Sequence, residues 1–365
     1  MTGQVGGLAV PAALESADPA EVLSRSLHAR AADFLRSLRM HQESAGSAQT
    51  AAAAEEAVRQ LRRASRRIGS ALLTYRSLVD AAWADELSGE LRHLSGTLAR
   101  EYRCSARQAR LLAALHRLAV EGVGGDRAAA LLERQHTLAR SRAHSAALET
   151  LVSSRFHAIA DAVAVLAYEV PLAPGAERGS AGAVLVPLAE RARERLVRAV
   201  EALPPPARAS ARARDGLEGR EVPQARGGHD LQSRQDAAWF EVRILLRHHR
   251  YAQEVLYAAG TPSDGVRPGG GEQGAAGADP PDQLLRAASA ALDRYRDSVE
   301  AAEAAAAAAR TPRIAPATAY ALGVLHAGQR QEAEVARREF GTSWQQVIKG
   351  ERTATQKREA AQQTV

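Results

Sequence analysis

The 365-residue chain has little cysteine, few aromatic side chains and no long apolar run, and each shortage excludes a class of protein. Its one cysteine, Cys104, has no second cysteine with which to form an internal disulfide bond or a metal cluster. No window of 18 apolar residues is free of charge, so we expect no membrane-spanning helix. The N-terminal segment also lacks a basic region before its short apolar run, which is unlike a secretory signal peptide. These absences predict a soluble, cytoplasmic protein.

The sequence also lacks the common motifs of catalysis. It contains no P-loop, no HExxH motif and no nucleophile elbow, and its glycine-rich segments at 121–126 and 267–274 do not join a strand to a helix. Carboxylates such as Glu90, Glu101 and Asp297 could hold a metal ion, but structural caps or salt bridges to arginine are the better interpretation. We therefore expect no enzyme activity and no metal ion or other cofactor.

Helix-forming residues fill most of the chain. Alanine, leucine, arginine and glutamate predominate, β-branched runs are scarce, and glycine and proline cluster in a few segments. This composition predicts an all-α fold. The breaks leave eight helical segments, at about 20–41, 51–79, 83–120, 126–169, 181–202, 231–258, 282–309 and 315–348. Four of them precede the loop at 170–183 and four follow it, which suggests two four-helix units.

The same breaks predict the domain boundaries. We expect one domain over 20–348, between a flexible N-terminal tail at 1–19 and a polar C-terminal tail at 349–365. Its first half would span about 20–170, and its second half about 181–348. Flexible insertions are expected in the second half at 203–230 and 259–282.

Positive charge is concentrated on one side of the helix predicted at 51–79. The formal net charge is +6, and lysine occurs only at Lys349 and Lys357, so arginine carries almost all of the positive charge. This balance favours polyanionic partners. At 100° per residue, the arginines of this helix form a strip opposite an apolar face: Arg59, Arg62, Arg63, Arg66 and Arg67. Glu55 and Glu56 lie in the first turn, and we expect the strip not to be neutralised locally.

A second arginine row follows 181 residues later. Arg243, Arg247 and Arg250 share one face of the helix predicted at 231–258, and the offset aligns Arg243 with Arg62 and Arg247 with Arg66. Each row lies on the second helix of its half, which indicates an internal repeat. A single basic strip is most often a solvated surface, but a repeated one favours an anion site.

At this point the sequence resembles the CHAD family, the conserved histidine α-helical domain. The segments that carry the resemblance are VRQLRRASRRIGSAL (58–72), ELRHLSGTL (90–98), FEVRILLRHHRY (240–251), AALDRYRDSVEA (290–301) and the last helix at 321–347. Their order and the two-half layout cover about 20–348. Arg59 and Phe240 stand at the positions of the two histidines for which the family is named, so the chain resembles a divergent member.

The resemblance implies two antiparallel four-helix bundles related by a pseudo-two-fold axis, with both basic helices lining a shared groove or pore. It also implies non-catalytic binding of inorganic polyphosphate, often at cytoplasmic granules. The residues expected to bind the polyphosphate are Arg59, Arg62, Arg63, Arg66, Arg67, Arg243, Arg247, Arg250 and Tyr251. Because Arg59 keeps a phosphate donor and Phe240 removes one, we expect an asymmetric site.

The chemistry of the arginine rows agrees with this implication, although two alternatives remain. Polyphosphate is a flexible linear anion, and arginine offers paired N–H donors and a permanent charge at regular spacing along a helix. Nucleic acid is a less favoured partner, because only 4% of the residues are aromatic and no nucleic-acid-binding motif is present. A helical scaffold for acidic proteins is the other alternative. The adjacent His248 and His249 point about 100° apart on a helix, so we interpret them as surface or phosphate-contacting residues and not as a metal pair.

Overall fold

The computed structural model describes residues 13–44, 51–120, 125–204, 226–258 and 280–362. Most of the predicted N-terminal tail and of the two predicted insertions lies outside these ranges. Within them the fold is all-α, as predicted. The helices are α1 (Ala13–Ser16), α2 (Pro19–Ser44), α3 (Ala51–Thr74), α4 (Ala81–Val120), α5 (Asp126–Leu151), α6 (Ser154–Leu166), α7 (Ala181–Glu201), α8 (Arg226–Ala258), α9 (Pro280–Ala309) and α10 (Pro316–Gln362).

The helix boundaries differ from the expected ones at three places. The segment predicted at 126–169 is two helices, because Ser153 caps α6 by accepting a hydrogen bond from the backbone N–H of Phe156 at 3.1 Å. The last helix, α10, runs on to Gln362, well beyond the expected end at 348. The short helix α1 lies inside the predicted N-terminal tail, and its Leu14 is fully buried.

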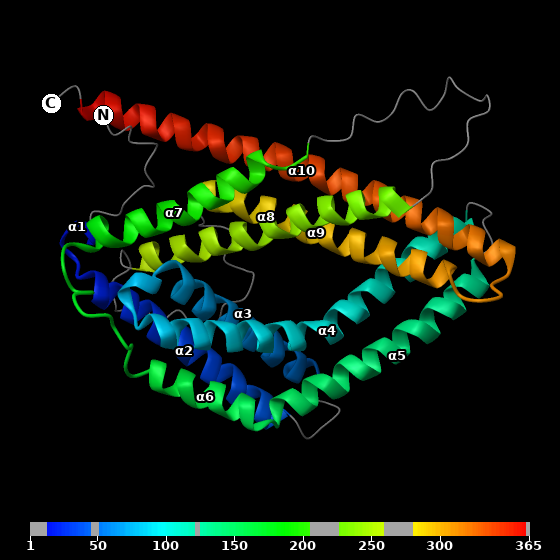
Figure 1. The fold of residues 1–365 in the computed structure, drawn as a ribbon, viewed down its shortest axis with the longest axis horizontal. Helices are drawn as coiled ribbons and strands as arrows, with labels where there is room; N and C mark the ends of the chain where they lie inside the picture. Colours follow the sequence, from blue (N-terminus) through cyan, green and yellow to red (C-terminus); the bar gives the residue numbers. More distant parts are fainter. Residues whose placement is uncertain (1–12, 45–50, 121–124, 205–225, 259–279, 363–365) are drawn as a thin grey trace.

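The helices pack in two layers. Figure 1 shows α7, α8, α9 and α10 above α2, α3, α4 and α6, with α5 running from the right-hand end to the lower edge. The layers meet where α3 faces α8: the Tyr75 hydroxyl, just beyond the end of α3, donates a hydrogen bond to the carbonyl oxygen of Ala252 at 2.9 Å. Arg67 on α3 also donates two hydrogen bonds to Glu254 on α8, at 2.8 and 3.2 Å. These bonds fix the spacing between the two helices that carry the predicted arginine rows.

The buried apolar side chains form three clusters. The first surrounds Phe34 and Ile68 in the lower layer and includes Leu185 of α7 and Val255 of α8. The second lies in the upper layer around Trp239, and the third joins the far ends of α4, α5, α9 and α10. Because the first and third clusters take residues from both halves of the chain, the apolar core does not divide at the loop at 170–183. The two-bundle arrangement and the internal two-fold axis therefore stay predictions.

A buried polar network supports the second cluster. The Asp236 carboxylate is 4% exposed; it accepts a hydrogen bond from the Tyr295 hydroxyl and two from Arg330, at 3.0 and 3.3 Å. Arg337 lies 3.5 Å from the same carboxylate and covers the rings of Trp239 and Tyr295. One carboxylate thus compensates two guanidinium groups that are largely shielded from water.

We expect the variant Asp236→Ala to lower the free energy of unfolding by about 3 to 5 kcal/mol, because it leaves the largely buried Arg330 without its anion and leaves Arg337 with only the more exposed Glu334. The measurement is urea denaturation followed by circular dichroism. The control is Glu339→Ala, which removes an exposed ion pair with Arg294 and should cost less than about 1 kcal/mol. Equal losses in the two variants would show that the buried network is not needed for stability.

Candidate functional site

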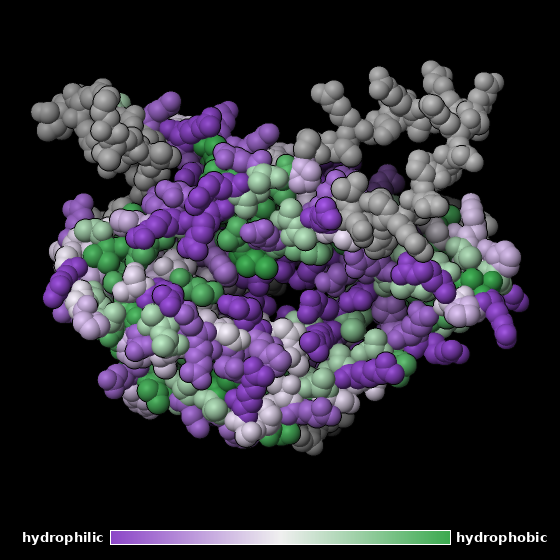
Figure 2. All heavy atoms as spheres, in the orientation of Figure 1, coloured by the Kyte–Doolittle hydropathy of each residue, from purple (hydrophilic) through white to green (hydrophobic). Residues whose placement is uncertain are grey.

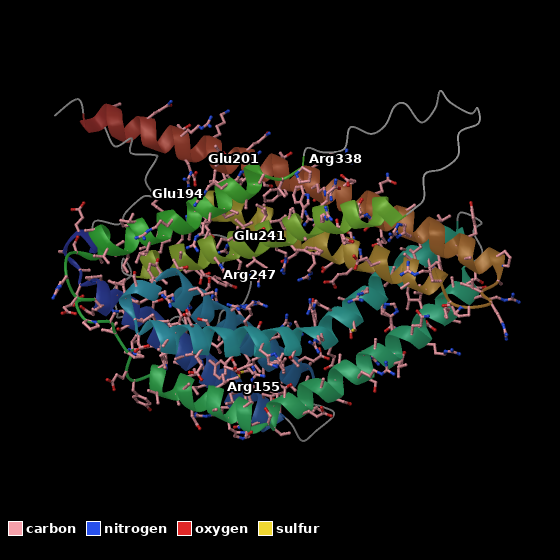
Figure 3. The ribbon with its side chains drawn as sticks, viewed as in Figure 1. Arg155, Glu194, Glu201, Glu241, Arg247 and Arg338 are labelled. Carbon is pink, nitrogen blue, oxygen red and sulfur yellow. The ribbon has the colours of Figure 1, made fainter. Side chains whose placement is uncertain are left out.

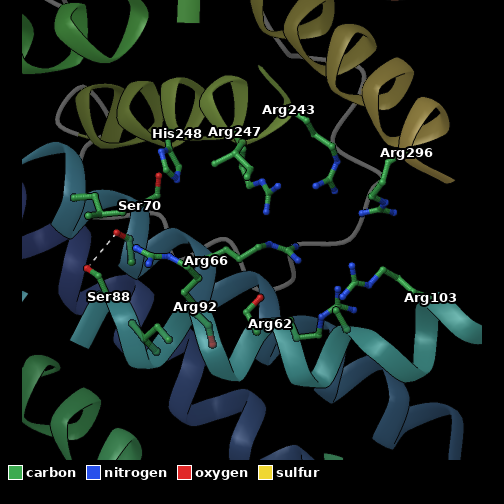
Figure 4. A pocket seen from close by; sticks show the side chains of 18 residues that line it. Arg62, Arg66, Ser70, Ser88, Arg92, Arg103, Arg243, Arg247, His248 and Arg296 are labelled. Atoms are coloured by element: carbon green, nitrogen blue, oxygen red, sulfur yellow. Dashed lines mark hydrogen bonds between the residues drawn. The ribbon is translucent and has the colours of Figure 1, made fainter. Parts of the chain in front are cut away.

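A cavity of about 320 Å³ opens between α3, α4 and α8, beside α9, and we call it the central cavity. Figure 2 shows a hollow with hydrophilic walls at the centre of the molecule, and Figure 3 places Arg247 beside it in the same orientation. The close-up in Figure 4 shows side chains from the two layers pointing toward one another across the opening. Seven arginines line the cavity: Arg62, Arg66, Arg92, Arg103, Arg243, Arg247 and Arg296.

The lining of the central cavity is strongly unbalanced in charge. Its 18 residues include seven arginines and His248 but no aspartate or glutamate. Among the described residues, Arg62, Arg66, Arg92 and Arg247 have no carboxylate partner. The Nε atoms of Arg62 and Arg66 are buried without a hydrogen-bond partner. The cavity therefore offers N–H donors and positive charge to an anion.

The arginines also act on one another. Burial, followed by the nearby positive charges of Arg66 and Arg103, lowers the pKa of Arg62 to about 10. Burial and the charges of Arg243 and Arg66 likewise lower the pKa of Arg247 to about 10. Both side chains remain protonated at neutral pH. A bound anion would relieve this repulsion and stabilise the charged forms.

Carboxylates support only the rim of the cavity next to α9. Arg243 donates a hydrogen bond to Asp293, Arg296 donates two to Asp297, and Arg103 lies 3.7 Å from Glu300. Burial alone would lower the pKa of Arg296, but Asp297 outweighs it and the pKa is raised. These pairs hold three guanidinium groups in position while the other four stay unpaired with acids.

The structure brings four of the nine predicted site residues to the central cavity: Arg62, Arg66, Arg243 and Arg247. The other five lie outside its lining. Arg67 binds Glu254 and lies 5.6 Å from the centre of the Tyr251 ring, so both residues belong to the contact between α3 and α8. Arg250 donates a hydrogen bond to Ser289 at 3.2 Å.

Arg59 and Arg63 lie on the remaining part of the predicted strip. Arg59 donates a hydrogen bond to Glu56 at 2.8 Å and lies 3.6 Å from Glu55. Together with Gln60, the two arginines lower the pKa of Glu56, with the hydrogen bond from Arg59 making the largest contribution. The expectation that the strip is not neutralised locally is therefore wrong for Arg59, because a spacing of three residues brings Glu56 within reach on a helix.

Three arginines of the cavity were not expected from the sequence: Arg92, Arg103 and Arg296. Arg92 and Arg103 are eleven residues, or about three helical turns, apart on α4 and so share one side of the helix. That spacing is visible in the sequence, but it does not say which side of α4 faces α3. Arg296 is next to Asp297 in the chain, and only the tertiary fold brings it to the cavity.

The two adjacent histidines have different environments. His248 lines the central cavity, and its pKa is lowered to about 4 by burial and by the charges of Arg247, Arg195 and Arg92. His249 is 1% exposed, and burial with the charges of Arg193 and Arg250 lowers its pKa to about 3. The expectation of a surface or phosphate-contacting residue is wrong for His249, because its side of α8 packs against the protein interior.

The carboxylates considered as metal ligands are occupied by ion pairs. Glu90 accepts hydrogen bonds from Arg155, Glu101 from His144, and Asp297 from Arg296. The interpretation as salt-bridge partners of arginine is confirmed for Glu90 and Asp297, whereas the partner of Glu101 is His144. In the part of the chain that the structure describes, no helix is long and apolar enough to cross a membrane.

The fold and the site together define an all-α protein with an arginine-lined cavity between its helices. The profile of the CHAD domain matches residues 29–268, and the chain belongs to the CHAD family. PptA from Streptomyces chartreusis is 48% identical, with a TM-score of 0.71 over 90% of this chain and 100% of PptA. The crystal structure of the CHAD domain from the plant Ricinus communis is 18% identical and shares the fold, with a TM-score of 0.52 over 93% of this chain and 97% of that domain. A search of curated proteins gave no match.

The low pKa values of the two histidines predict a loss of stability in acid. The folded protein keeps His248 and His249 neutral down to about pH 4 and about pH 3, whereas both take up a proton near pH 6.5 in the unfolded chain. The unfolded state then binds more protons, so the free energy of unfolding falls as the pH drops from about 6.5 toward 4.

The variant His248→Gln tests this pH dependence. Between pH 6.5 and 4.5 we expect it to lose about 1 to 2 kcal/mol less stability than the wild-type protein, since one of the two depressed groups is absent. Urea denaturation at several pH values measures the difference. Parallel pH profiles would contradict the environment described for His248.

Proposed function

We propose that the central cavity binds inorganic polyphosphate without catalysis. The observation that carries this proposal is the convergence of seven arginines on one cavity whose lining includes no carboxylate. Four of the seven have no carboxylate partner among the described residues, and a protein does not stabilise itself by placing unpaired like charges together, so such a cluster indicates an anionic ligand. Membership of the CHAD family, which is linked to polyphosphate binding, supports the same ligand.

The geometry favours a flexible phosphate chain. Arg62 and Arg66 approach the cavity from α3, while Arg243 and Arg247 approach it from α8, on the opposite wall (Figure 4). Each guanidinium group can donate two hydrogen bonds to phosphate oxygens, so the two walls would hold successive phosphates from both sides. The hydroxyls of Ser70 and Ser95 add neutral donors between the cations, whereas those of Ser65 and Ser88 already donate to backbone carbonyl oxygens.

Nucleic acid fits the cavity less well. No phenylalanine, tyrosine or tryptophan lines the cavity, so its walls provide no aromatic ring on which a base could stack. A scaffold for acidic proteins would need an accessible basic surface, whereas several of these donors are buried. We therefore propose that the protein binds polyphosphate in the cytoplasm, including polyphosphate in granules.

The first test removes the charge of both walls. Replacing Arg62, Arg66, Arg243 and Arg247 by alanine should lower the affinity for long-chain polyphosphate at least about a hundredfold, because each lost charge-assisted hydrogen bond weakens binding several-fold. The slope of log affinity against log salt concentration should also flatten by about 3, for four lost phosphate contacts. Binding to immobilised polyphosphate at several salt concentrations measures both changes.

The matched control for this variant replaces four exposed arginines outside the cavity, namely Arg36, Arg134, Arg198 and Arg338. It removes the same net charge and should change the affinity by less than about threefold, since distant surface charges are screened by salt. Circular dichroism verifies that both quadruple variants keep their helices. Equal retention of the cavity variant and the control would overturn the site.

A second test compares the possible polyanions. At equal phosphate concentration, long-chain polyphosphate should displace a fluorescent duplex DNA from the protein, and the DNA should not displace labelled polyphosphate. We expect this order because the site would bind phosphate groups by their charge and spacing and has no side chains placed to contact bases. The reverse order of displacement would assign the cavity to nucleic acid, and no response to either polymer would favour a protein partner.

A further inference from the structure

A second cavity, of about 310 Å³, lies on the neighbouring side of α4, and we call it the outer cavity. Its lining consists of Gly89, Arg92, His93, Gly96, Thr97, Arg100 and Arg103. Three of these residues, Arg92, Gly96 and Arg103, also line the central cavity. The two cavities therefore meet along one edge of α4.

Gly96 lies at the edge that the two cavities share, and its lack of a side chain leaves that edge unobstructed. It lies on α4 between Arg92 and Arg103, and a β-carbon added to it would meet no other atom within 4 Å. Glycine is a poor helix former, so its presence in the middle of a 40-residue helix is not explained by helix stability. With no side chain at this position, the space above the helix is open from one cavity to the other.

Charge distinguishes the outer cavity from the other spaces near Arg103. Two further cavities that Arg103 lines also include Glu300; Arg100 lines one of them as well, and the other includes Asp297. Glu300 already lies 3.2 Å from Arg107 and 3.7 Å from Arg103, so it lowers the positive potential there. The outer cavity has no carboxylate in its lining, and the exposed Arg100 has no carboxylate partner among the described residues.

We propose that a polyphosphate too long for the central cavity crosses α4 at Gly96 and continues in the outer cavity against Arg100. This inference rests on the proposed function and adds to it a preference for long chains. A short chain would occupy only the central cavity, whereas a long chain would gain further contacts from Arg100 and from the outer faces of Arg92 and Arg103.

The variant Arg100→Glu tests the added contacts, because it places a negative charge in the outer cavity and leaves the lining of the central cavity unchanged. We expect the affinity for long-chain polyphosphate to fall about tenfold and the affinity for tripolyphosphate to change less than about twofold. Isothermal titration calorimetry measures both. The matched control is Arg134→Glu, an equal charge change at an exposed residue of α5 that lines neither cavity, and it should affect neither ligand.

The variant Gly96→Leu tests the crossing. Its side chain would project into open space and raise helix propensity, so the melting temperature should not fall. Because Gly96 also lines the central cavity, both ligands are measured: long-chain affinity should fall at least about fivefold, and tripolyphosphate affinity should change less than about twofold. The control Gly328→Leu makes the same change at a helical glycine of α10 that also has open space around it, and it should not change the affinity.

The outcomes separate this inference from the function on which it rests. If the wild-type protein binds neither tripolyphosphate nor the long chain, both are overturned. If it binds them and either Arg100→Glu or Gly96→Leu binds the long chain as its control does, only the path over α4 is overturned. A loss confined to the long chain in Arg100→Glu, with a loss in Gly96→Leu, supports the path.

Discussion

The guanidinium groups around the central cavity repel one another, and the rest of the structure has to hold them together. The pKa values of Arg62 and Arg247 are lowered first by burial and then by this repulsion. Two features oppose it. Arg67 and Glu254 join α3 to α8 beside the cavity, and the carboxylates of α9 lie behind part of its rim. The fold thus keeps a concentrated positive potential that the acids of α9 offset only in part, which is the kind of environment that attracts a polyanion.

The sequence predicts the helices and four of the seven arginines that line the central cavity, because both depend on local patterns. Arg62 and Arg66 share a helix face by spacing, and the offset of 181 residues identifies Arg243 and Arg247 as their counterparts. The ion pair of Arg59 with Glu56 is equally local and could have been predicted. The contacts of Arg67 with Glu254 could not have been predicted, since 187 residues separate the two and the pattern of neither helix indicates which residue it will contact. The positions of Arg92, Arg103 and Arg296 depend in the same way on which helix faces meet.

The two positions at which the sequence departs from the histidines of the family lie outside the central cavity. Arg59 is held by Glu55 and Glu56 of its own helix, and Phe240 packs with its ring centre 6.1 Å from that of Tyr295. Neither residue lines the cavity, so the donors of the proposed site do not depend on them. His248, which does line it, is neutral at pH 7, so arginine alone supplies its positive charge.

The near absence of lysine is consistent with this environment. The cavity lowers the pKa of a guanidinium group from 12.5 to about 10, and such a group is still fully protonated at neutral pH. A lysine begins near 10.4, so an equal decrease would bring its pKa to about 8 and remove part of its charge under mildly alkaline conditions. Lysine would also offer a point charge in place of paired N–H donors. Clustered, partly buried cations can thus all stay charged when they are arginines, and a cavity built in this way keeps its positive charge across the physiological pH range.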